Sequence, residues 1–243
     1  MRPPEYYEWD FIEEAAMHTK WVKKVFLSVG WAALSCAVAG AQTDVALSLY
    51  GAFTGTTNAN GVTQSPANAA GGLLEVRHIV HPWMGFEGTY AFNRANQAYS
   101  GLFYPPVTSC IAGSCGPATE IAAVSANAHE VTGDWVASLK VGNLRPFALA
   151  GGGILFDAPS GQILQSGSVI MACGGTNPSC TNTTTKPVFV YGGGVDWGLL
   201  PHLGLRFQYR GNLYKAPALT TVFTSTGAFT HTAEPMIGVY FRL

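Results

Sequence analysis

Four cysteines occur as two closely spaced pairs whose side chains could form disulfide bonds. Cys110 and Cys115 flank the segment IAGS, and Cys173 and Cys180 flank GGTNPS. In an oxidising compartment near neighbours pair, so we predict the bridges Cys110–Cys115 and Cys173–Cys180. Zinc binding is the competing interpretation, but neither spacing is that of a Cys-x-x-Cys motif and no histidine lies within either loop. We expect no metal site and no bound cofactor.

His129 lies beside Glu130 and close to Ser125, which is a second grouping with catalytic potential. Histidine with serine or an acid performs acyl transfer when both groups reach one reacting atom within hydrogen-bond range. Adjacent residues of a strand point to opposite faces, so His129 and Glu130 would not act together. We therefore expect that the chain is not an enzyme.

Most charged residues alternate with apolar ones along extended segments. In LGLRFQYRG, Leu205, Phe207 and Tyr209 fall on one face of an extended chain, and Arg206 and Arg210 fall on the other. The charged faces are predicted to meet in an interior network whose acids and bases pair almost completely, because an unpaired buried charge costs roughly several kcal/mol. The predicted network comprises Glu75, Arg77, Glu87, Glu130, Asp134, Asp196, Arg206, Arg210, Glu234 and Arg242.

The other face of each predicted strand, formed by the residues that alternate with the charged ones, is apolar. Trp135, Phe147, Leu149, Leu155 and Phe207 are assigned to this face. Arg145 and Asp157 are among the charged residues assigned to strand ends or loops.

The alternation predicts eight strands joined by connections of alternating length. The strands are expected at 44–53, 71–80, 84–93, 127–141, 145–156, 187–198, 203–214 and 233–243. Each is near or above the roughly 9 to 11 residues that cross a bilayer when tilted. Long connections run through 54–70, 94–126, 157–186 and 215–232, and the others are short turns. Long loops on one side and tight turns in the periplasm are typical of an outer-membrane barrel, and both cysteine pairs fall in long loops.

Composition agrees with a membrane barrel and excludes a nucleic-acid-binding protein. Charged residues make up 11% of the 243-residue chain, against about 25% in ordinary soluble domains. The net charge of -1 gives no basic stripe for nucleic acid. With hydrocarbon outside, the apolar face is solvated by lipid and the charges turn inward. The predicted fold class is all-β, an eight-stranded antiparallel up-and-down transmembrane β-barrel, too narrow for an open pore.

Residues 1–41 are predicted to be an N-terminal extension and a signal peptide, and residues 42–243 the barrel domain. Three lysines precede the apolar run 25–34, and Ala39-Gly40-Ala41 suits signal peptidase. The run is shorter than the roughly 20 residues of a spanning helix. Residues 1–16 are acidic, so Met17 is an alternative start. Lipidation at Cys36 is a further alternative, although the residues before it are a poor lipobox.

Two segments resemble the OmpA-like family of small, eight-stranded outer-membrane β-barrels. GGGVDWGLLPHLGLRFQYRG (192–211) is similar to that family's penultimate hairpin, and AEPMIGVYFRL (233–243) to its C-terminal strand, although the chain ends in Leu243 instead of an aromatic residue. The resemblance implies the outer membrane of a Gram-negative-type bacterium, contact with outer-membrane lipid, and insertion by the barrel-insertion machinery through the C-terminal strand. We expect a monomer.

These observations predict a structural and interaction role. The chain would be an integral outer-membrane barrel that presents disulfide-pinned loops to an extracellular ligand. A narrow porin-like channel for small solutes is the alternative, and a lipid-A-modifying enzyme a further one. A soluble periplasmic barrel that binds a small ligand is the outlying interpretation.

Overall fold

The computed structural model describes residues 42–103, 118–165, 181–221, 223 and 225–243, which form an all-β unit. Its strands are β1 (Gln42–Thr54), β2 (Thr57–Ala59), β3 (Val62–Pro66), β4 (Ala69–His81), β5 (Met84–Phe103), β6 (Ala118–Ser138), β7 (Leu144–Gln165), β8 (Thr184–Gly198), β9 (Leu203–Lys215) and β10 (Phe229–Arg242).

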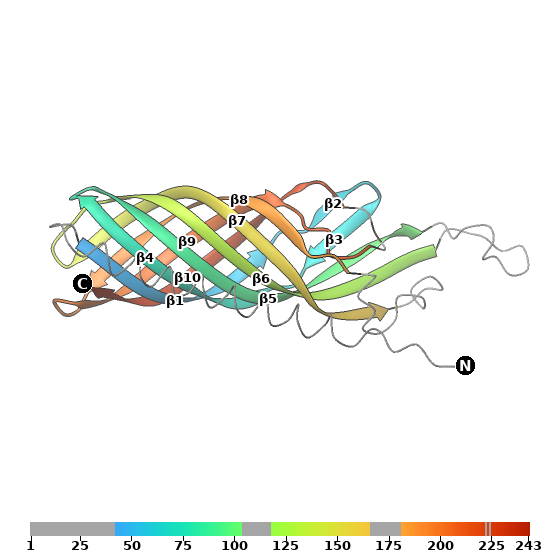
Figure 1. Ribbon diagram of the computed structural model, residues 1–243, viewed down its shortest axis with the longest axis horizontal. Coiled ribbons are helices and arrows are strands. Elements are labelled where there is room, and N and C mark those ends of the chain that lie inside the picture. The colour runs from blue at the N-terminus through green and yellow to red at the C-terminus, as the bar shows by residue number, and fades with distance from the viewer. Residues whose placement is uncertain (1–41, 104–117, 166–180, 222, 224) are drawn as a thin grey trace, which may run out of the picture. The chain divides into compact units, whose positions relative to one another are not determined.

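Eight of these strands close into a barrel. The hydrogen-bonded order runs β5-β4-β1-β10-β9-β8-β7-β6, and pairing between β5 and β6 returns to the first strand. The paired strands run antiparallel, and Figure 1 shows them tilted around a common axis. Closure leaves no unpaired edge on the ring. The predicted eight-stranded antiparallel barrel is confirmed.

No helix in the part of the chain that the structure describes is long and apolar enough to cross a membrane.

Three strands exceed their predicted lengths by six residues or more, whereas the other five exceed theirs by at most three. β5, β6 and β7 have 20, 21 and 22 residues, so the predicted loops 94–126 and 157–186 begin and end in strand. The connection 54–70 also contains structure, because β2 and β3 form a hairpin that pairs with the far end of β5, from Val62 opposite Gly101 to Pro66 opposite Gln97. These three strands and the hairpin build a sheet beyond the end of the barrel that lies opposite the short turns (Figure 1). We call this the outer end, and the opposite one the turn end.

The predicted faces are correct on the other barrel strands but reversed on β7. Phe147, Leu149 and Leu155 are buried, whereas Ile154 is exposed. Arg145 pairs directly with Asp196 of β8, and directly opposed residues share a face, so the odd-numbered residues of β7 from Arg145 to Asp157 point inward. Apolar residues occur on both faces of β7, and Gly151–Gly153 carry no side chain, so the period of two is not visible there.

Candidate functional site: the charged lumen

The middle of the lumen is filled by two arginines that bridge three carboxylates. Arg206 donates from Nε and Nη2 to the two oxygens of Asp196, at 2.7 and 3.0 Å. Its Nη1 lies 3.4 Å from Glu75 and 3.6 Å from Glu87. Arg77 donates from Nε to Glu87 at 2.6 Å and from Nη1 to Asp196 at 3.2 Å. Both guanidinium groups are fully buried, so they occupy the space through which a solute would have to pass.

An aromatic ring also packs in the middle of the lumen, against these arginines. The guanidinium of Arg77 lies over the ring of Phe147, 4.0 Å from its centroid, a cation–π arrangement that strengthens when the cation is desolvated. Gly194 makes room for the ring, since a Cβ at that position would lie 2.9 Å from Phe147 Cζ. The glycine-rich run of β8 therefore has a packing function in the lumen.

A second layer lies toward the outer end and is centred on Arg210. Its Nη2 donates to Glu130 at 3.1 Å and to the hydroxyl of Thr132 at 3.2 Å, and lies 3.9 Å from Asp134. Asn212 donates to the other oxygen of Glu130 at 2.9 Å. Asp134 also accepts from Thr132 at 2.9 Å. This layer has one arginine for two carboxylates, and neutral donors supply the remaining hydrogen bonds.

A third layer closes the turn end of the lumen. Arg145 Nη1 and Arg242 Nε each lie 3.5 Å from the carboxylate of Asp44. Arg145 was assigned to a strand end by the sequence, and its inward position follows from the reversed faces of β7. Here cations outnumber carboxylates.

The buried charges do not balance, contrary to the nearly complete pairing that the sequence suggested. Among the described residues, eight carboxylates and four arginines are buried. Asp157 and Glu234 make no ion pair in the described part of the chain, and one oxygen of each has no hydrogen-bond partner there. Both line a cavity of about 30 Å³ at the outer end. A water needs roughly 10–15 Å³ of such space, so solvent can satisfy these groups where arginine does not.

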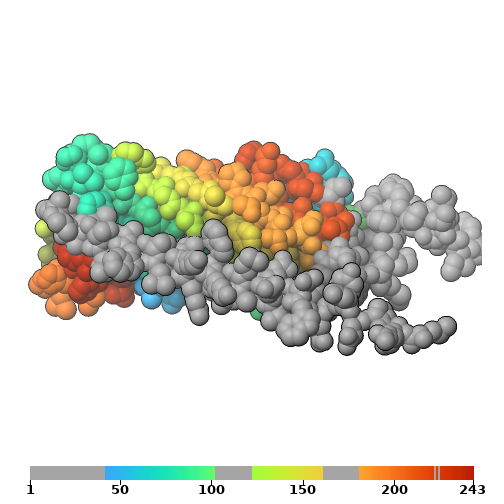
Figure 2. Space-filling model, in the orientation of Figure 1, coloured from blue at the N-terminus to red at the C-terminus, as the bar shows by residue number. Residues whose placement is uncertain are grey.

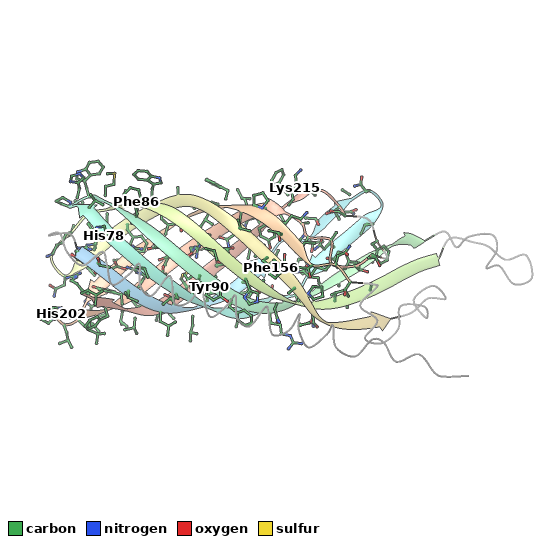
Figure 3. All side chains as sticks on the ribbon, viewed as in Figure 1. His78, Phe86, Tyr90, Phe156, His202 and Lys215 are labelled. Carbon is green, nitrogen blue, oxygen red and sulfur yellow. The ribbon has the colours of Figure 1, made fainter. Side chains whose placement is uncertain are left out.

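The outer wall of the barrel is apolar. Large side chains are exposed on one face of every barrel strand; Leu49, Val80, Phe86, Trp135, Ile154, Phe189, Phe207 and Ile237 are examples, one from each. Figure 2 shows an unbroken wall where coloured atoms are visible, and Figure 3 places Phe86 on it near the turn end. A closed ring with charges inside and large apolar side chains outside is suited to hydrocarbon as its outer solvent.

The chain is a small, eight-stranded β-barrel of the outer-membrane type.

Comparison with solved structures returns barrels of this kind. Ail, the attachment invasion locus protein of Yersinia pestis, crystallised with the heparin analogue sucrose octasulfate, matches with 13% identity and a TM-score of 0.46, over 84% of this chain and all of that chain. Neisserial surface protein A matches with 10% identity and a TM-score of 0.41, over 84% and 97%. OprG from Pseudomonas aeruginosa matches with 10% identity and a TM-score of 0.46, over 84% and 96%. No protein-family model and no curated protein matches the sequence.

The outer end of the barrel is covered by the segment that follows β9. Leu219 is fully buried in a small apolar core beyond the lumen, together with Val62, Tyr99, Val124 and other residues of β3, β5 and β6. Tyr99 fixes the backbone of the segment, because its hydroxyl donates to Pro217 O at 2.9 Å and accepts from Leu219 N at 3.2 Å. Burial raises the pKa of the Tyr99 phenol, so it stays a donor. We call residues 216–221 the cap.

Replacing Tyr99 with phenylalanine should loosen the cap without unfolding the barrel. The change removes the hydroxyl contacts to Pro217 and Leu219, at a cost of about 1–3 kcal/mol. Hydrogen exchange at the Leu219 amide should accelerate, while exchange at Val239 in β10 stays unchanged. Tyr209→Phe, on the outer wall, is the matched control. Unchanged exchange at Leu219 would show that the hydroxyl does not hold the cap.

The candidate catalytic group is not assembled as a triad. His129 Nδ1 is hydrogen-bonded to the Tyr90 hydroxyl at 2.8 Å, and its ring contacts Phe92 on the outer wall. Ser125 donates instead to Asn96 at 2.6 Å, and four residues of strand separate it from His129 by about 13 Å. Glu130 points into the lumen. In the described part of the chain no cluster of His, Cys, Asp or Glu could hold a metal ion.

The predicted disulfide residues Cys110, Cys115, Cys173 and Cys180 lie outside the described residues.

Proposed function

We propose that this barrel is a structural and interaction protein of the outer membrane of a Gram-negative-type bacterium, with its turns in the periplasm and its long connections outside. The observation that carries this proposal is the filled lumen, in which Arg77, Arg206 and Arg210 are fully buried in ion pairs beneath a packed cap. Such a lumen leaves the outer surfaces as the parts that meet partners. The same packing disfavours the alternative of a porin-like channel.

Conductance across a planar lipid bilayer tests this function. The purified barrel should give no stable single-channel current, because each ion would have to displace a buried guanidinium. An unrelated open porin, reconstituted in the same way, serves as the positive control. A steady current that survives Arg77→Lys unchanged would favour the channel function instead.

The loops are proposed to be pinned by the bridges Cys110–Cys115 and Cys173–Cys180 and to contact an extracellular ligand. The support is their placement between strands that end on the outer side, where the compartment is oxidising. Peptide mass spectrometry of the unreduced protein should recover both bridges. Recovery of free thiols, or of a crossed pair such as Cys115–Cys173, would contradict the pairing.

Lipid contact follows from the outer wall, and insertion through β10 and a monomeric state are part of the same proposal. Extraction from membranes should require detergent. The lipid-A-modifying alternative is tested by mass spectrometry of lipid A after expression, which should show no new species.

A further inference from the structure

A pocket of about 280 Å³ opens at the turn end of the barrel. The turn before β7 and the turn between β8 and β9 form its walls, and three cationic side chains, Lys140, Arg145 and Arg242, contribute to its lining. Figure 3 labels His202 at this end and Lys215 toward the opposite one. The pocket is separate from the acid-lined cavity beneath the cap.

The pocket has an excess of positive charge. Asp196 lines its floor, but both oxygens of that carboxylate are engaged by Arg206, and one also by Arg77. Asp44 is another carboxylate close to the pocket, and it is shared between Arg145 and Arg242 at 3.5 Å each. Lys140 is exposed and extends the cationic wall toward solvent.

Arg242 also keeps exposed surface for a ligand. Its Nε is buried and lies 3.5 Å from Asp44, but the side chain as a whole is 27% exposed and lines the pocket. A guanidinium presents several N–H groups in a planar fork that matches the oxygens of a phosphate, and an ammonium adds a point charge. The volume is large enough for such a group with its substituent.

We propose that this pocket binds a phosphate group. Leu144, Leu199 and Leu200 on its rim are exposed by 46%, 48% and 62%, which suits an anion carried by an apolar molecule. The two sources of this chemistry are a phospholipid headgroup at the periplasmic surface of the bilayer and free inorganic phosphate. The lipid source rests on the proposed membrane placement, whereas binding of inorganic phosphate does not.

The test is a titration of the detergent-solubilised full barrel, in a phosphate-free maltoside micelle at constant ionic strength. Inorganic phosphate is added in one arm and short-chain phosphatidylglycerol in the other, and the amide resonances of Gly142, Asn143 and Gly198 are followed by NMR. Saturable shifts are expected with at least one probe. The variant Lys140→Gln/Arg242→Gln should bind roughly tenfold more weakly or worse. Lys215→Gln, a cation at the opposite end, should bind as the original chain does.

Saturation by the lipid alone identifies the headgroup as the ligand, and saturation by both probes identifies the phosphate itself. Absence of saturable shifts with either probe would overturn the proposal, as would equal affinity in the double variant. Heat-resistant gel mobility of the double variant confirms that it is folded. Saturation of the original chain by inorganic phosphate alone would support the phosphate site and count against a lipid headgroup as its ligand, and so against the proposed membrane placement.

Discussion

Replacing Arg206 with leucine is expected to lower the free energy of unfolding by about 3–5 kcal/mol, the usual cost of removing one partner from a buried ion pair. Arg206 contacts Glu75, Glu87 and Asp196 at once. Its loss leaves Glu75 without an ion pair among the described residues, and leaves Glu87 and Asp196 to share Arg77. Urea-induced unfolding in lipid vesicles, followed by tryptophan fluorescence, measures the change. The variant should also lose its heat-resistant mobility on unboiled gels.

Two controls separate charge from packing. Lys215→Leu removes an exposed cation at the outer end and should change stability by less than about 1 kcal/mol. Arg206→Leu combined with Asp196→Leu should be less destabilised than Arg206→Leu alone, because one stranded carboxylate is gone. If Arg206→Leu unfolds at the same urea concentration as the original barrel, the mid-lumen network does not hold the strands together.

Placing arginine on the outer wall, by Ile237→Arg, should cost about 2–4 kcal/mol. Ile237 is 51% exposed on β10, between Leu49 of β1 and Phe207 of β9, so its side chain has apolar neighbours on both sides and would face hydrocarbon. The same unfolding assay in lipid vesicles measures the loss.

Leu200→Arg is the matched control for this prediction. Leu200 is 62% exposed, but it lies in the turn between β8 and β9, at the end of the barrel. The substitution there should cost only about 0–1 kcal/mol, as at a membrane interface. Equal effects at the two positions would mean that the wall at Ile237 is not covered by lipid.

The strand number and the closed ring could be predicted because the period of two is strong where lipid and charge lie on opposite faces. Arg206 between Leu205 and Phe207 is the clearest case, since the arginine requires a polar environment and its two neighbours require an apolar one. The predicted strand at 203–214 accordingly differs from the observed β9 by a single residue at its end.

The features that were not predicted lie where this contrast is absent. Beyond the bilayer, β5 and β6 carry mainly small and polar residues such as Ala95, Asn96 and Ala123, which give no alternation. The β2–β3 hairpin does have a local signal, because Asn60 and Gly61 both have positive φ, 55° and 72°, and Asn-Gly favours this kind of tight turn. The faces of β7 could not be read because Phe147 and Leu149 are apolar but point into the lumen.

The charged residues of the lumen could be named from the sequence, but their partners could not. Arg77 and Glu87 are neighbours across one strand pair, whereas Arg77 and Asp196, or Arg210 and Glu130, meet across the lumen. Such contacts depend on barrel diameter and stagger, which no local pattern encodes. The cap could not be predicted for the same reason, since Leu219 and Tyr99 are distant in sequence.

The long β5 and β6 determine how far the protein reaches from the cell. About ten residues of each suffice to cross the hydrocarbon, which leaves about ten more of β5 on the outer side. At roughly 3.4 Å per residue and a tilt of about 40°, their outer ends stand on the order of 25 Å above the lipid tails. With the turns in the periplasm, as proposed, a large macromolecule outside the cell would meet this tip before it met the lipid-facing wall.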